Sequence, residues 1–210
     1  MQFQRSHLSI VRSIRQLSLV RDWLRARGGE GLPSIVSFAP DARAGDAQEL
    51  SLFKLARHRD AIDAICLHAG ERVRAIHDAA MWGRSLQACL DPAVAAAAAP
   101  VWNACVATQL PVYAIIPVTD RQGCPVTIEQ LLLPYARASA QADFMVASLH
   151  AWSTEGRFVA RGLLRGKAGA PRHWAVLIDP EATTAIEPMH DADAGPGWHA
   201  PDDQAAFAVI

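Results

Sequence analysis

The chain has 210 residues, a mass of 22.7 kDa, 51% hydrophobic residues and a formal net charge of −1. A chain of this size buries one core, and its balanced charge excludes nucleic acid as a default partner, because such binding needs many Lys and Arg side chains to neutralise phosphates. No stretch approaches the roughly 18 apolar residues of a membrane helix, and residues 1–20 lack the apolar run of a secretory signal, so we expect a cytoplasmic protein without membrane contact.

The first expected element is an amphipathic helix over residues 9–27. Its hydrophobic side chains recur at helical spacing on one stripe, at Ile10, Ile14, Leu17, Val20 and Leu24. Gly28 and Gly29 follow the last basic turn, as a helix C-cap requires. If the domain itself leaves this stripe uncovered, a second copy of the chain covers it, so we expect a homodimer through this helix.

Residues 32–46 contain prolines, glycine and aspartates, which predict an irregular connector anchored by Ile35, Val36 and Phe38. Two short strands are then expected over residues 49–55 and 61–67.

Short helical turns are expected after Gly70, ending near Gly83. A helix over residues 92–109 should follow, because Asp91 is a good N-cap residue and Pro92 suits the first helical position.

The second half of the chain predicts an antiparallel meander. Three β-rich runs span residues 112–118, 126–135 and 143–152, and the segments between them are turn-like in composition. Together with the two earlier strands they predict an α+β sheet covered by helices on one face.

The two ends of the chain carry opposite charge. Residues 1–27 hold six arginines against Asp22, a formal +5, and residues 166–210 hold two basic residues against seven carboxylates, a formal −5. This polarity would let the C-terminal extension dock on the first helix of the same or a second subunit. Within the extension, residues 173–179 predict one additional strand.

Several short motifs follow one another in a defined order. A helix ending in W-x-x-x-x-G-G precedes LPS and an A-P step, at Trp23, Gly28, Gly29, Leu32, Pro33, Ser34 and Pro40. Gly70 follows the second strand, GRSL spans residues 83–86, and LLLP spans residues 131–134. In this order and spacing, residues 17–152 resemble bacterial stand-alone PAS-fold proteins.

The resemblance implies a PAS-like five-stranded antiparallel sheet with helices on one face, enclosing a small cavity, and a role in signal reception or protein contact. We therefore divide the chain into an N-terminal helix (1–31), a PAS-like domain (32–165) and an acidic C-terminal extension (166–210). Because no kinase, cyclase or DNA-binding segment accompanies the domain, we expect an unidentified regulatory protein as its partner.

No nucleophile elbow and no C-x-x-C pair is present, so neither a catalytic residue nor a metal site is predicted. The four cysteines are expected to be buried thiols. His68 and His77 bracket Gly70 and would face the inside of a PAS cavity, where an imidazole binds haem iron or an acidic ligand; alternatively, backbone or solvent satisfies them.

The remaining candidate ligand-binding residues are Trp82, Trp102, Asn103 and Tyr113, which either line an apolar pocket or fill a solid core. The helix over residues 92–109 lacks a histidine and Cys89 lacks the motif of flavin photochemistry, so both cofactors are disfavoured and the cofactor is unknown. Glu129 is interpreted as facing solvent, or as paired with Arg84 or Arg137.

Two hypotheses follow. The first is a non-catalytic PAS-type sensory or interaction module that has the capacity to bind a small apolar ligand. The second is a small-molecule carrier or an enzyme of unrecognised type, using the pocket around His77, Trp102 and Asn103.

Overall fold

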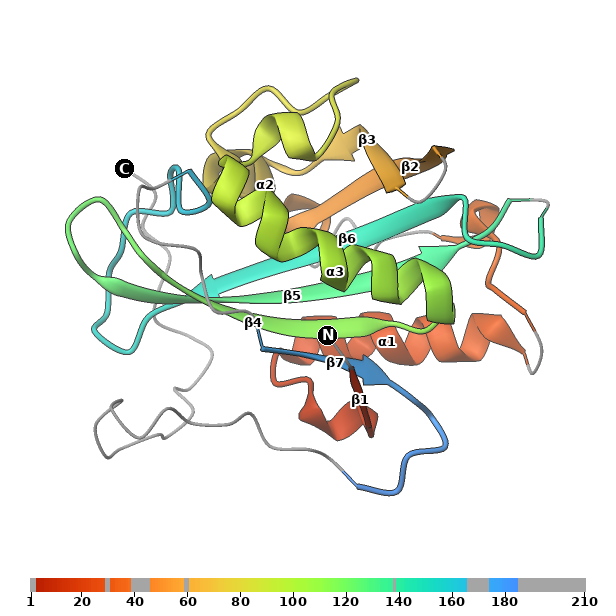
Figure 1. Cartoon of the computed structure of the whole chain (residues 1–210). Coiled ribbons are helices and arrows are strands. Elements are labelled where there is room, and N and C mark those ends of the chain that lie inside the picture. The colour runs from red at the N-terminus through yellow and green to blue at the C-terminus, as the bar shows by residue number, and fades with distance from the viewer. Residues whose placement is uncertain are drawn as a thin grey trace.

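The computed structural model describes residues 3–28, 31–38, 46–58, 61–137, 139–165 and 174–184. It is a mixed α+β structure in which seven strands form one sheet and helices pack on both of its faces (Figure 1). No helix within these residues is long and apolar enough to cross a membrane.

The strands are β1 (Gln4–Ser6), β2 (Leu50–His58), β3 (Ala61–Ala69), β4 (Val112–Thr119), β5 (Pro125–Tyr135), β6 (Phe144–Trp152) and β7 (Trp174–Ile178). The α-helices are α1 (Ile14–Arg27), α2 (Glu71–His77) and α3 (Pro92–Thr108). Short 3-10 turns are η1 (Leu8–Ile10), η2 (Ile35–Ser37), η4 (Asp46–Glu49) and η5 (Gln87–Cys89).

The strand order is β1-β7-β4-β5-β6-β2-β3. Its five central and distal strands, β4-β5-β6-β2-β3, pair antiparallel, as expected. The sheet is nevertheless larger than the five strands expected, because two more strands join it. β7, from the acidic extension, pairs antiparallel with β4 and confirms the strand predicted over residues 173–179, and β1 pairs with β7 in parallel.

Both ends of the described chain are fastened at this edge of the sheet. Arg5 Nη1 donates to Asp179 Oδ2 at 2.9 Å, and the His7 N–H donates to the Thr184 carbonyl at 3.1 Å. The strand that the extension contributes is therefore held by residues from the other end of the chain.

Helices cover both faces of the sheet, which corrects the expectation of helices on one face. Leu132 packs with Trp102 and Cys105 of α3 in one core cluster, whereas Leu131 and Leu133 pack with the α1 residues in a second cluster on the opposite face. Because β5 is covered on both sides, every residue from 128 to 135 is buried. This explains the uninterrupted LLLP run, which is typical of strands buried on both faces.

Helix α1 begins at Ile14, later than predicted, because the Ser13 side chain caps it by accepting from the Gln16 N–H. It ends at Gly28 in the left-handed conformation, as expected. Its fully buried side chains are Gln16, Val20 and Trp23, so the buried face is rotated from the predicted stripe.

Only Ile14 of the predicted stripe is largely exposed, at 69%. Ile10 and Val20 are buried, and Leu17 and Leu24 pack against the second core cluster. The domain therefore covers most of the surface that was expected to hold a homodimer.

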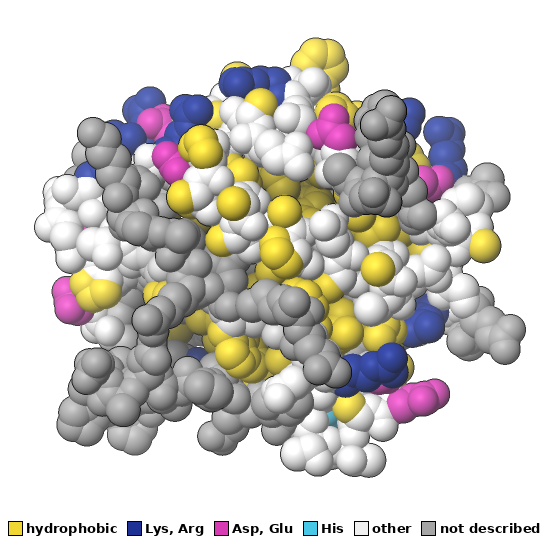
Figure 2. All heavy atoms as spheres, in the orientation of Figure 1, with side chains coloured by type: hydrophobic (Ala, Val, Ile, Leu, Met, Phe, Trp, Pro, Cys, Tyr) yellow, Lys and Arg dark blue, Asp and Glu magenta, His cyan; other side chains and the backbone are white. Residues whose placement is uncertain are grey.

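Figure 2 shows the α3 face, where hydrophobic side chains gather over the middle and Lys and Arg lie mostly at the rim. The helix itself starts as predicted, with the Ala93 N–H donating to Asp91 Oδ1 at 3.0 Å and Pro92 at its first position. Val101, Trp102, Cys105 and Val106 form its buried face.

Candidate functional site

The interior between β3 and α3 is packed. A small cavity of about 30 Å³ lies at the edge of this region, bordered by buried residues such as Ala64 and Trp102 and by the exposed Asn103. This is the space of roughly one water molecule. Beside it the Phe53 and Trp102 rings meet edge to face, with their centroids 5.1 Å apart.

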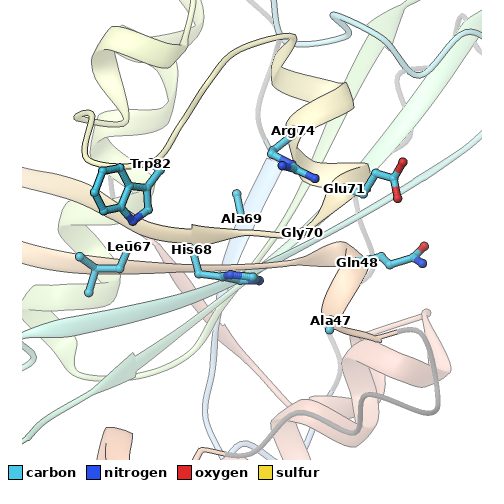
Figure 3. Close-up of a pocket in the computed structure, with 9 residues that line it drawn as sticks. All are labelled: Ala47, Gln48, Leu67, His68, Ala69, Gly70, Glu71, Arg74 and Trp82. Atoms are coloured by element: carbon cyan, nitrogen blue, oxygen red, sulfur yellow. The ribbon is translucent and has the colours of Figure 1, made fainter.

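A larger hollow, of about 390 Å³, opens at the surface where η4, the end of β3 and the start of α2 meet. Figure 3 shows the nine residues that line it: Ala47, Gln48, Leu67, His68, Ala69, Gly70, Glu71, Arg74 and Trp82. Its volume lies within the range of ordinary ligand sites, about 300–1,000 Å³, but it is open rather than enclosed. We name these nine residues the Gly70 hollow.

The floor of the Gly70 hollow depends on glycine. The Gly70 N–H donates to the Leu50 carbonyl at 2.8 Å. A Cβ atom at Gly70 would lie 2.5 Å from the carbonyl carbon of Gln48 and closer still to the carbonyl oxygens of Ala47 and Gln48. Only a residue without a side chain lets η4 and α2 approach this closely.

The two ends of the hollow differ in chemistry. Leu67 and Trp82 lie beside one another at one end, and Gln48 and Glu71 lie at the other (Figure 3). Trp82 is 81% exposed, so a large aromatic ring faces solvent. Arg74 reaches from α2 over Gly70, and it has no ion pair with any described residue. Exposed aromatic rings beside a charged group are typical of interaction surfaces.

The hollow adjoins an open part of the sheet edge. β3 is the last strand, and Ser85 bridges its outer side at Ile65. The two neighbours of Ser85 also pair with β3. The Arg84 carbonyl accepts a hydrogen bond from the Cys66 N–H, and the Leu86 N–H donates one to the Ala64 carbonyl. Residues 67–69, which border the hollow, lie beyond this loop pairing within the described chain.

The structure brings together two pairs of the six predicted ligand-binding residues. His68 and Trp82 both line the Gly70 hollow, and Trp102 and Asn103 both border the small cavity. Trp82 therefore belongs neither to the core nor to an interior pocket. Tyr113 lies on the α1 face of the sheet, so it is separated from Trp102 by the sheet itself.

His77 is buried at the end of α2. Burial lowers the pKa of its imidazole to about 4, although a hydrogen bond to the Cys89 backbone opposes this shift. Its Nδ1 atom has no hydrogen-bond partner among the described residues. The ring is therefore a neutral core histidine at physiological pH.

Glu129 does not face solvent, which corrects its interpretation from the sequence. It is 3% exposed and accepts a hydrogen bond from Trp152 Nε1 at 2.9 Å. Burial and the neighbouring Glu129 carboxylate raise the pKa of the Tyr113 phenol well above its ordinary value. The α1 face of the sheet thus buries polar side chains as well as apolar ones.

Glu49 is the centre of an ion-pair cluster that the sequence did not reveal. It is 3% exposed and accepts from Arg72 Nη1 of α2 and, at 3.3 Å, from Arg15 Nη1 of α1. Its other oxygen lies 3.6 Å from His150 Nδ1 of β6. Burial opposes the charged form, but His150 and Arg72 outweigh it and hold the pKa of Glu49 below its usual value. These partners are too far apart in the sequence for any spacing rule to find them.

Within the part of the chain that the structure describes, no three His, Cys, Asp or Glu side chains gather as metal ligands would. Cys66, Cys89 and Cys105 are buried free thiols, as predicted, and Cys124 is partly exposed. Burial raises the pKa of the Cys66 and Cys89 thiols, which makes them poor nucleophiles.

No family model matches the chain, and no curated protein matches it. Among solved structures, the chain is similar to one titled "Structure of an RNA-binding Light-Oxygen-Voltage Receptor", with a TM-score of 0.35 and 16% sequence identity. The match covers 57% of this chain and 36% of that one. A similarity this low carries no argument about function, and the RNA binding in that title is said of that protein alone.

Proposed function

We propose that this chain is a non-catalytic PAS-type interaction module that binds a regulatory protein at the Gly70 hollow. The observation that carries the proposal is a contrast. One small cavity of about 30 Å³ lies between β3 and α3, whereas an open hollow of about 390 Å³ lies beside the exposed indole of Trp82. The antiparallel strands β4-β5-β6-β2-β3, with α2 and α3 on one face, support the PAS-type assignment that the sequence motifs imply.

The hollow suits a protein segment of defined chemistry. An apolar side chain of the partner would pack against Trp82 and Leu67, where burying one such side chain is worth about 1.5–3 kcal/mol. A carboxylate of the same segment would pair with Arg74. The partner segment is therefore expected to combine an apolar anchor with an acidic residue.

The second hypothesis needs a different interior. A carrier or enzyme working around His77, Trp102 and Asn103 would need an enclosed pocket of several hundred Å³. The packed ring pair of Phe53 and Trp102 and the neutral, buried His77 favour the interaction module instead.

A homodimer through α1 and a cytoplasmic location are further parts of the proposal. Because most of the apolar stripe is covered, such a dimer would depend on Ile14 and on the basic outer surface of α1, to which the acidic extension is complementary.

Site-specific photo-crosslinking tests the partner site. A photoreactive amino acid at position 82 is compared with one at position 36, because Val36 is also an exposed apolar side chain, at 77%, but lies outside the hollow. The expected result is a protein adduct from position 82 alone, lost in the Arg74→Glu variant. The identified partner is then purified, and Trp82→Ala should weaken its binding by at least about tenfold, as loss of an aromatic anchor does.

Two outcomes would contradict the proposal. The first is equal adducts from positions 82 and 36. The second is a small molecule that native mass spectrometry finds bound to the wild type and to Trp82→Ala alike.

A further inference from the structure

One wall of the Gly70 hollow is directly connected to Glu49 through the backbone. Ala47 and Gln48 form one wall and are followed directly by Glu49 in η4. Their carbonyl groups pack against the backbone of Gly70, with no room for even a methyl group. A partner that moves this wall must therefore move Glu49 or the first turn of α2.

The Glu49 carboxylate contacts both helices that flank this end of the sheet. Arg72 is one residue beyond the hollow-lining Glu71 on α2, and Arg15 belongs to α1 on the other face. His150 Nδ1 on β6 lies 3.6 Å from the same carboxylate. A single buried carboxylate is thus shared by the wall of the hollow and by the N-terminal helix.

Sharing makes the contacts interdependent. A buried carboxylate that loses one cation is left with an uncompensated charge, because it has no access to bulk water, and the contacts that it makes with its remaining partners become less stable as well. Movement of Arg72 away from Glu49 should therefore change the contact between Glu49 and Arg15, although the two arginines lie on helices that cover opposite faces of the sheet.

We propose that Glu49 couples occupation of the Gly70 hollow to the position and stability of α1. This regulation rests on the proposed function, since it assigns a consequence to partner binding at that hollow. In this role Arg15 and Arg72 act as positioning residues. The consequence of binding is a loosened α1.

Hydrogen exchange of the α1 amides tests the coupling without the partner. Leu67→Trp enlarges a side chain inside the hollow and imitates an occupant, whereas Val36→Trp enlarges an exposed side chain outside it. Leu67→Trp should speed exchange in α1 by about fivefold or more, the lower end of usual coupling strengths, and Val36→Trp should not.

The two arginines complete the experiment. Arg72→Gln, on α2, should speed exchange in α1, and adding it to Arg15→Gln should change α1 little further. Asp22→Asn is the control, because it breaks an exposed pair with Arg25 on α1 and should change exchange by less than about twofold. The inference is overturned if Arg72→Gln affects α2 alone, or if Leu67→Trp still acts fully on α1 in the Arg15→Gln background.

These outcomes separate the inference from the proposed function. If position 82 captures its partner but the α1 exchange stays unchanged in Leu67→Trp, the hollow binds a protein without this coupling. If the exchange changes but no partner is captured at position 82, the coupling exists and the proposed partner site is wrong.

Discussion

Replacing Gly70 with alanine reverses the usual sign of a Gly→Ala substitution. Gly70 has φ −64° and ψ 165°, a conformation that alanine adopts without strain. At such a position the substitution normally stabilises a protein by about 0.4–1 kcal/mol, because it restricts the unfolded chain.

The structure predicts the opposite because of the neighbouring backbone. The new Cβ atom would lie 2.5 Å from the Gln48 carbonyl carbon, whereas unstrained carbon contacts are about 3.5 Å or longer, so η4 must move by roughly 1 Å. Overpacking of this kind costs about 1–3 kcal/mol. We expect Gly70→Ala to lower the free energy of unfolding by up to about 2.6 kcal/mol after the entropic gain is subtracted.

Urea-induced unfolding followed by tryptophan fluorescence measures this difference. Glu71→Ala is the matched control, since Glu71 is the next residue, is exposed and forms no ion pair with a described residue. Its substitution should change the free energy of unfolding by less than about 0.5 kcal/mol. A Gly70→Ala variant that is more stable than the wild type would refute the proposed contact between η4 and α2.

Three further results are expected. Trp102→Ala should lower the free energy of unfolding by about 3–5 kcal/mol because it empties a packed core, whereas Trp82→Ala should change it by less than about 0.5 kcal/mol; urea unfolding of both variants compares them. The folded-state pKa of His77 is about 4, below its ordinary 6.5, so the unfolded chain binds a proton first and stability should fall as pH drops from 6.5 towards 4; His77→Leu should lose this part of the pH dependence, and an unchanged profile would contradict a buried neutral ring. The pKa of Glu49 is lowered from 4.5 in the folded state, so its stabilisation is present above pH 4.5 and is lost as pH falls through the lower folded value; thermal unfolding should show the wild type and Glu49→Gln converging only in that acidic range.

Local signals in the sequence were sufficient for most of the elements. Asp91 and Pro92 marked the start of α3 correctly, and Gly28 marked the end of α1, because caps depend on neighbouring residues alone. The meander of β4, β5 and β6 followed from its polar turns. The same reasoning placed the start of α1 too early, because it overlooked Ser13, a local N-cap signal of the same kind.

Contacts between distant segments were beyond sequence reasoning. The position of α1 on the second face depends on Gln16, whose side chain donates to the Glu129 and Ser148 carbonyls, and a glutamine does not stand out in a hydrophobic pattern. The Gly70 hollow was anticipated only through His68 and Trp82. Its link to Glu49 requires the three-dimensional arrangement of α1, η4 and α2.

The parallel pairing of β1 with β7 constrains when β1 can join the sheet during folding. Gln4 pairs with Val176, so a ribosome must synthesise over four fifths of the chain before the first strand has a neighbour. Closing so long a loop is slow, and β4 has an unpaired edge until β7 arrives. During synthesis, the nascent domain is therefore expected to expose the aggregation-prone edge of β4. Its need for chaperones should be greatest just before residue 174 emerges from the ribosome.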